Sequence, residues 1–131
     1  HCHTLVTVGR VFSLDDPARA LELFDEAGIV CDRAHGVSDI RHARIGLEAA
    51  CAFERSGQAG RAVELAETIW PVLAAHGQDE RLAALYTIEA DSLAATEPGS
   101  ARAAAAARLA ADWSAYALGP GRRAANCQPK G

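Results

Sequence analysis

The chain has 131 residues, of which 50% are hydrophobic, so it can bury the core of one domain but is too short for two. Its apolar content is mostly Ala and Leu, with 5% aromatic residues and five prolines, which favours an all-α fold over a β-sheet fold. A net charge of −4 and a pI near 5.7 argue against a nucleic-acid-binding protein, because such proteins gather Lys and Arg on one face.

The first hairpin is predicted to pair a short helix over residues 4–12 with an amphipathic helix over residues 18–36. Asp16 is a typical N-cap residue and Pro17 suits the first helical position, so the start of the second helix is well marked. Its apolar residues recur at helical spacing and form the expected core face, which consists of Ala20, Leu23, Phe24, Ala27, Val30, Cys31 and Ala34.

The second hairpin is predicted to pair a helix over residues 38–56, apolar almost all round, with a helix over residues 60–77. Gly57 and Gly77 stand where left-handed glycine caps end such helices. Pro71 lies opposite the apolar stripe of its helix, so we expect it to bend that helix without ending it. The stripe consists of Ala62, Ala66, Ile69 and Leu73.

The third hairpin is predicted to consist of helices over residues 79–95 and 100–118, joined by a Pro-Gly turn. Asp79 and Ser100 are the expected helix caps. The tail at residues 119–131 has no hydrophobic periodicity and carries Gly, Pro and basic residues, so we expect a disordered tail or linker.

The hairpins form an internal repeat. The Arg-Ala pairs that begin at Arg19, Arg61 and Arg102 are 42 and then 41 residues apart, which is the length of one helical hairpin per period. We therefore expect one domain over residues 1–118, in which each hairpin contacts only the next. Its three repeats would cover about residues 1–36, 37–77 and 78–118.

This pattern resembles the tetratricopeptide repeat family, whose signature is a set of small and aromatic residues across two antiparallel helices. The residues that carry the resemblance are Ala20, Phe24, Ala27, Phe53, Gly57, Ala62, Ala103, Ala107 and Ala110. The chain departs from the family by its longer period, by Gly46 at a position for a large aromatic residue, and by a missing closing proline. The resemblance implies a right-handed α-solenoid of three antiparallel hairpins, as in the extended arrays of large bacterial transcriptional regulators.

A polar stripe follows the helix over residues 38–56 at spacings of three and four, and consists of Arg41, Arg44, Glu48, Cys51 and Arg55. In the family that the chain resembles, the first helix of each hairpin lines the concave groove, so these are the candidate partner-binding residues. The next hairpin would flank them with Leu85, Ile88, Ser92 and Ala95. The alternative is a solvated helix face with an ordinary Arg44–Glu48 ion pair.

Two patterns have metal-ligand spacing, and neither favours a metal site. Cys31 and His35 lie four residues apart, but Cys31 falls on the core stripe and His35 has a repeat counterpart at His76. Residues 1–3 read His-Cys-His and would chelate copper or nickel only at a free amino terminus. Because the chain contains no methionine, we expect it to be a piece of a longer protein. The sequence also contains no recognisable nucleophile motif and no glycine-rich phosphate loop, so no metal, cofactor or catalytic residue is expected.

The sequence predicts a non-catalytic module that binds a protein or peptide in the concave groove. The four cysteines show no paired spacing, and no segment resembles a signal peptide or a membrane span, so we expect a cytoplasmic protein with reduced thiols. One alternative is a small-molecule effector domain of a transcriptional regulator, which would need an enclosed apolar pocket. Another is a structural spacer in a longer repeat array.

Overall fold

The computed structural model describes residue 9, residues 16–35 and residues 40–122. In this part of the chain all regular secondary structure is helical, as the composition predicts, and the helices are α2 (Pro17–His35), α3 (Ile40–Arg55), α4 (Ala59–Ala75), α5 (Asp79–Thr96) and α6 (Ala101–Leu118). None of these five helices combines the length and hydropathy that crossing a membrane requires. Most of the first predicted helix and most of the predicted tail lie outside the described residues.

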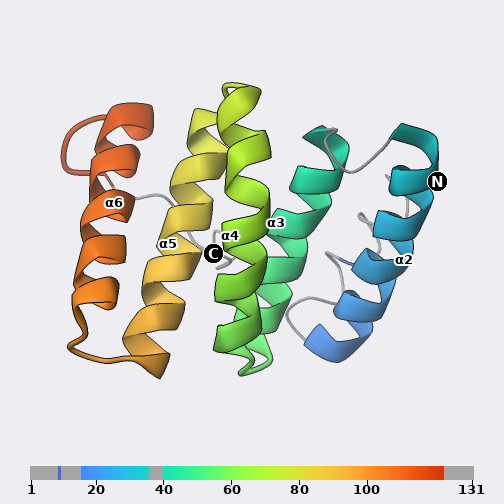
Figure 1. Cartoon of the computed structure of the whole chain (residues 1–131), viewed down its shortest axis with the longest axis horizontal. Coiled ribbons are helices and arrows are strands. Elements are labelled where there is room, and N and C mark those ends of the chain that lie inside the picture. The colour runs from blue at the N-terminus through green and yellow to red at the C-terminus, as the bar shows by residue number, and fades with distance from the viewer. Residues whose placement is uncertain (1–8, 10–15, 36–39, 123–131) are drawn as a thin grey trace.

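The five helices follow one another along the long axis of the molecule, with α2 and α6 at opposite ends (Figure 1). Each helix packs against the next one in sequence, and α3 also packs against α5. Among the described helices, the backbones of α2, α4 and α6 do not approach one another closely. Thus α3 separates α2 from α4, and α5 separates α4 from α6.

The buried side chains form three clusters along this row of helices. The first joins α2 to α3 around Phe24, the largest joins α3, α4 and α5 around Ile69 and Leu73, and the third joins α4, α5 and α6 around Ala103 and Ala106. The core residues predicted for α2 and α4 are confirmed where their side chains are described, because all of them are at most 6% exposed: Ala20, Leu23, Phe24, Ala27, Ala62, Ala66, Ile69 and Leu73.

Two of the predicted N-caps are confirmed. Asp16 and Ser100 each accept a hydrogen bond from the backbone N–H three residues further on, at 3.1 Å and 3.0 Å. The prediction for Asp79 is wrong, because Asp79 is the first residue of α5 and Gln78 precedes it without a side-chain cap hydrogen bond. Asp79 instead places a negative charge in the first turn, where the helix dipole favours it.

The glycine caps at Gly57 and Gly77 are also confirmed. Both residues have a positive φ, of 80° and 63°, which costs a glycine nothing and strains any residue with a Cβ. The residue after each glycine donates its N–H to the carbonyl five positions earlier, at 2.8 Å and 3.0 Å. The same hydrogen-bonded cap therefore ends α3 and α4 and sets the two turns between successive helices.

Helix α4 continues through Pro71 to Ala75, as the sequence predicts. A proline has no N–H to donate to the carbonyl four residues earlier, and its ring crowds that carbonyl. Pro71 is exposed, so water can bond the carbonyl that loses its helical partner. The helix therefore tolerates a proline on this face, whereas the opposite face carries its buried stripe.

Gly46 lies at a close approach of α3 to α4. A Cβ built at this position would lie 2.9 Å from Cγ2 of Ile69, which is fully buried. A large side chain at position 46 would therefore push the two helices apart. This contact explains why the chain departs here from the aromatic residue of the tetratricopeptide pattern.

Replacing Gly46 by alanine should destabilise the fold by about 1–2 kcal/mol, because overpacking against Ile69 outweighs the gain in helix propensity. Gly28 in α2 is the matched control, since a Cβ there meets nothing within 4 Å. Gly28→Ala should stabilise the fold by about 0.5–1 kcal/mol. Urea denaturation followed by circular dichroism measures both changes. If the free energy of unfolding changes with the same sign in both variants, the contact at Gly46 is not a tight one.

Candidate functional site

The predicted polar stripe lies on α3 and is only partly open to solvent. Arg41 and Arg44 are exposed, whereas Glu48, Cys51 and Arg55 are partly buried. Cys51 packs against the largest core cluster, so its side chain contributes to the fold. Arg44 and Glu48, which have the spacing of an intrahelical ion pair, do not form one.

The expected apolar wall on α5 is wrong. Leu85 and Ile88 are 0% exposed and Ser92 is 1% exposed, so these residues belong to the core. The Ser92 hydroxyl donates to the carboxylate of Glu54 on α3 at 3.5 Å. Because α5 packs against α3, α4 and α6, its face toward α3 is covered. Of the four residues predicted to flank the stripe from α5, only Ala95 is exposed.

The two patterns with metal-ligand spacing cannot be placed. The side chains of Cys31 and His35 and the whole of residues 1–3 lie outside the described part of the structure. Within the described part, no three His, Cys, Asp or Glu side chains come together in a metal-binding arrangement.

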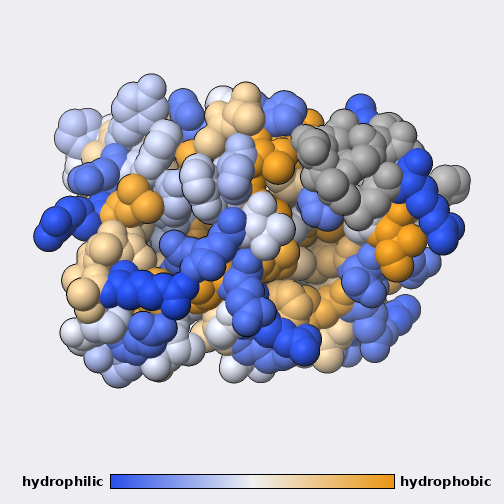
Figure 2. All heavy atoms as spheres, in the orientation of Figure 1, coloured by the Kyte–Doolittle hydropathy of each residue, from blue (hydrophilic) through white to orange (hydrophobic). Residues whose placement is uncertain are grey.

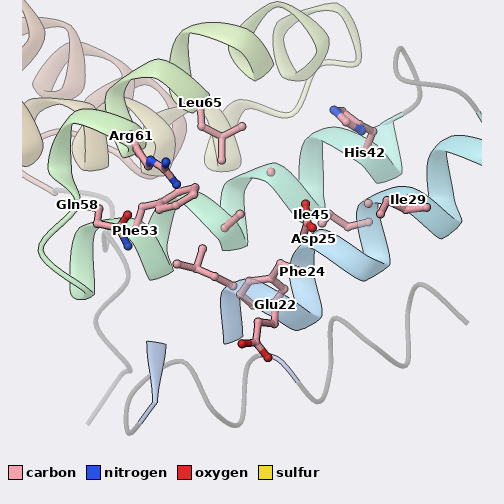
Figure 3. Close-up of a pocket in the computed structure, with 14 residues that line it drawn as sticks. Glu22, Phe24, Asp25, Ile29, His42, Ile45, Phe53, Gln58, Arg61 and Leu65 are labelled. Atoms are coloured by element: carbon pink, nitrogen blue, oxygen red, sulfur yellow. The ribbon is translucent and has the colours of Figure 1, made fainter. Parts of the chain in front are cut away.

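A cavity of about 570 Å³ lies between α2 and α4, with α3 as its floor (Figure 3). Leu21 and Phe24 of α2 form one wall, Leu65 of α4 forms the other, and Ile45 and Ala49 of α3 lie beneath them. In the space-filling view, hydrophobic side chains are visible between α2 and α4 with charged side chains around them (Figure 2). We call this site the α2–α4 groove.

The rim of the α2–α4 groove carries both charge signs. Glu22 and Asp25 line it from α2 and Arg61 lines it from α4, and all three are exposed. Glu22 forms an ion pair with Arg19 of its own helix at 2.8 Å. Asp25 and Arg61 form no ion pair with any described residue. The acidic side chains therefore line one edge of the groove and the basic side chain lines the other.

Arg61 lies over the ring of Phe53, with its guanidinium carbon 5.8 Å from the ring centroid (Figure 3). A second cavity of about 380 Å³ shares Phe53, Arg61 and Leu65 with the α2–α4 groove and reaches Thr68. The hollow surface thus continues past Arg61 along the outer side of α4. This cation–π contact orients the guanidinium at the point where the two hollows meet.

The equivalent junction between α4 and α6 is closed by an ion pair. Arg102 of α6 pairs with Glu67 of α4 across α5, and with Glu97 at 3.2 Å. Glu67 lies 42 residues after Asp25, and Arg102 lies 41 residues after Arg61, which are the spacings of the repeat. The same pair of positions is therefore bridged at one junction and unbridged at the other.

The ion pair between α4 and α6 lies beside a carboxylate that the fold destabilises. Burial raises the pKa of Glu89 above its ordinary value, the charge of Glu67 raises it further, and Arg102 lowers it by less. Burial also raises the pKa of Tyr86, with a smaller contribution from Glu89. The hydrogen bond to Glu67 is the main cause of a raised pKa at Arg102.

The groove could not be found by searching for reactive residues. Glu22 and Asp25 lie outside the predicted core face of their helix, and both are exposed in the structure. The sequence contains one weak indication of the groove. Leu21 and Leu65 are large apolar residues beside the predicted core stripes, and both are only half-buried in the structure. None of the predicted stripe residues lines the α2–α4 groove or the cavity that adjoins it.

No family model matches this sequence, and no curated protein or solved structure shows significant similarity to the chain. The resemblance to the tetratricopeptide repeats therefore stays a prediction from the residues that carry it.

Glu89→Gln should raise the thermal midpoint at about pH 7, since the wild-type carboxylate is ionised there at a site that disfavours its charge. Because the pKa of Glu89 is raised in the folded state, the carboxylate takes up a proton as the pH falls through that pKa. The free-energy penalty of its buried charge then disappears as the pH approaches the ordinary glutamate pKa. The two proteins should therefore melt at nearly the same temperature at about pH 4. Thermal melts across this range test the sign, and a variant that is less stable at neutral pH would show that Arg102 dominates.

Proposed function

We propose that this chain is a non-catalytic helical repeat module, a right-handed α-solenoid of antiparallel hairpins, that binds a peptide or protein segment. The observation that carries the proposal is the α2–α4 groove, in which Leu21, Phe53 and Leu65 stay half-exposed between two helices. An open apolar groove with a charged rim gains free energy when a partner covers it.

The packing order supports the solenoid. Each helix contacts its neighbour in sequence, and α2 does not pack against the third hairpin of α5 and α6. Repeat proteins are built in this way, and their stacked hairpins leave extended grooves that bind partners. Membership in a bacterial regulatory protein rests on the family resemblance, and a cytoplasmic location rests on the cysteine pattern. Both belong to the same proposal.

The form of the groove favours binding over catalysis. Enzyme sites close over their substrates and exclude water, which strengthens the electrostatic interactions inside them. Here the charged groups Glu22, Asp25 and Arg61 are exposed at an open rim. The volume of about 570 Å³ is also within the range of small-molecule sites. An open groove would leave much of a small ligand in water, so a peptide is the better candidate.

Selection from a displayed library of random peptides of about 16 residues, or roughly four helical turns, tests the proposal. The purified chain should enrich peptides that bind it in solution with micromolar dissociation constants, measured by fluorescence anisotropy. A chain that enriches no peptide above an unrelated helical protein would contradict the proposed function.

The binding surface can be assigned with one variant on each side of α3. Ala49 is at the floor of the α2–α4 groove, so Ala49→Leu should fill part of the groove and weaken peptide binding by roughly fivefold or more. Arg44 is exposed on the polar stripe, and Arg44→Glu should change the affinity by less than about twofold. The opposite result would move the binding site to the stripe of Arg41, Arg44, Glu48, Cys51 and Arg55.

A further inference from the structure

The α2–α4 and α4–α6 junctions occupy equivalent places in the repeat, and the differences between them indicate the chemistry of the partner. Glu67 of α4 and Arg102 of α6 bridge their junction, and the side chains below them are buried. Asp25 of α2 and Arg61 of α4 occupy the same repeat positions, yet they line an open groove and are not bridged. Within the described residues, one junction is thus bridged by the chain's own side chains, and the other is not.

The two junctions differ in side-chain size and burial. At the closed junction Val63 of α4 and Ala106 of α6 are buried in one cluster. The residues at the matching positions of the open junction are the larger Leu21 and Leu65, which are only half-buried. The two leucines therefore expose apolar surface to the groove, whereas the valine and the alanine of the closed junction do not. The groove has apolar walls that the chain does not cover with any described residue.

The floor of the groove allows a close approach from outside. The small residue Ala49 of α3 lies on this floor, and Gly28 lines the wall that α2 forms. A Cβ at Gly28 would meet nothing within 4 Å, so the space above it is open. Small residues between large ones let the side-chain ridge of a helix enter a groove between two helices.

A helical partner also leaves no main-chain hydrogen-bonding group unpaired in the groove. Helices α2 and α4 use their main-chain N–H and C=O groups internally, so they offer no edge to which an extended strand could bond. A peptide helix brings its own hydrogen bonds and presents only side chains to the groove. Its apolar residues at helical spacing would pack against Leu21, Phe53 and Leu65.

We propose that the α2–α4 groove binds an amphipathic peptide helix with basic side chains along the edge that faces Glu22 and Asp25, and acidic side chains along the edge that faces Arg61. This inference rests on the proposed function and names the partner that fits its groove. A basic side chain of the partner would pair with Asp25, and an acidic one would pair with Arg61. At the closed junction Arg102 and Glu67 pair with each other instead. Because the two edges differ in sign, the charges of the partner also fix the direction in which its helix lies.

Charge-reversal variants of the two edges test the inference with the displayed peptide library as the probe. The wild-type chain should enrich peptides with an apolar stripe between one basic and one acidic edge. Arg61→Glu makes both edges acidic, so its enriched peptides should lose their acidic edge. Asp25→Arg sets a basic side chain beside Glu22 and removes the net negative charge of the other edge, so its enriched peptides should lose their basic edge. A wild-type-selected peptide should bind either variant roughly tenfold more weakly.

Arg108→Glu and Asp112→Arg are the matched controls, because both residues are exposed on α6 and do not line the α2–α4 groove. They make the same changes in net charge, and they should leave the enriched sequences unaltered and the affinity within about twofold. Circular dichroism melts of all four variants should match the wild type, since exposed charges contribute little to stability.

Three outcomes separate this inference from the proposed function. Enriched peptides whose charges do not respond to Arg61→Glu or Asp25→Arg would overturn the inference, and so would peptides that are lost with Arg44→Glu. In both cases the chain still binds peptides, so the proposed function stands. A library that yields no binder to any form of the folded chain would remove both.

Discussion

The structure depends on the close packing of successive helices, which small residues make possible. Ala20, Ala27, Ala62 and Ala66 are at most 2% exposed, and each lies at a contact between neighbouring helices. Gly46 brings α3 still closer to α4, because any Cβ there would meet Ile69. Alanine loses no side-chain entropy on burial but buries little apolar area, so no single contact dominates. Stability is therefore spread along the row of helices, which is held together by three buried clusters.

Features that depend on a few neighbouring residues could be predicted from the sequence. The N-caps at Asp16 and Ser100, the glycine turn at Gly57 and the buried stripe of α4 follow from local geometry, and all of them are confirmed. Asp79 was misplaced by one residue, since an acidic residue is favourable both at a cap and in the first helical turn. Helical periodicity alone cannot separate these two positions.

The candidate site could not be predicted in the same way, because it depends on which faces the neighbouring helices cover. The apolar stripe of α5 that includes Leu85 and Ile88 has the spacing of a groove wall, yet α5 is surrounded by three helices and buries it. The α2–α4 groove depends on differences between repeats that look minor in sequence. Asp25 and Glu67 differ by one methylene, and a leucine at position 65 replaces the alanine at position 106. The effect of these differences on the closure of a junction becomes apparent only when the two junctions are compared in the structure.

The open junction has a consequence for the stability of the first hairpin. Among the described helices, α2 packs only against α3, whereas α3, α4 and α5 each pack against at least two others. In a repeat protein each interface adds its own share of stability. A partner in the α2–α4 groove would contact α2 and α4 together and so add an interface that joins these two helices. Binding and the docking of α2 would then be linked, because whatever binds only the docked α2 stabilises that arrangement.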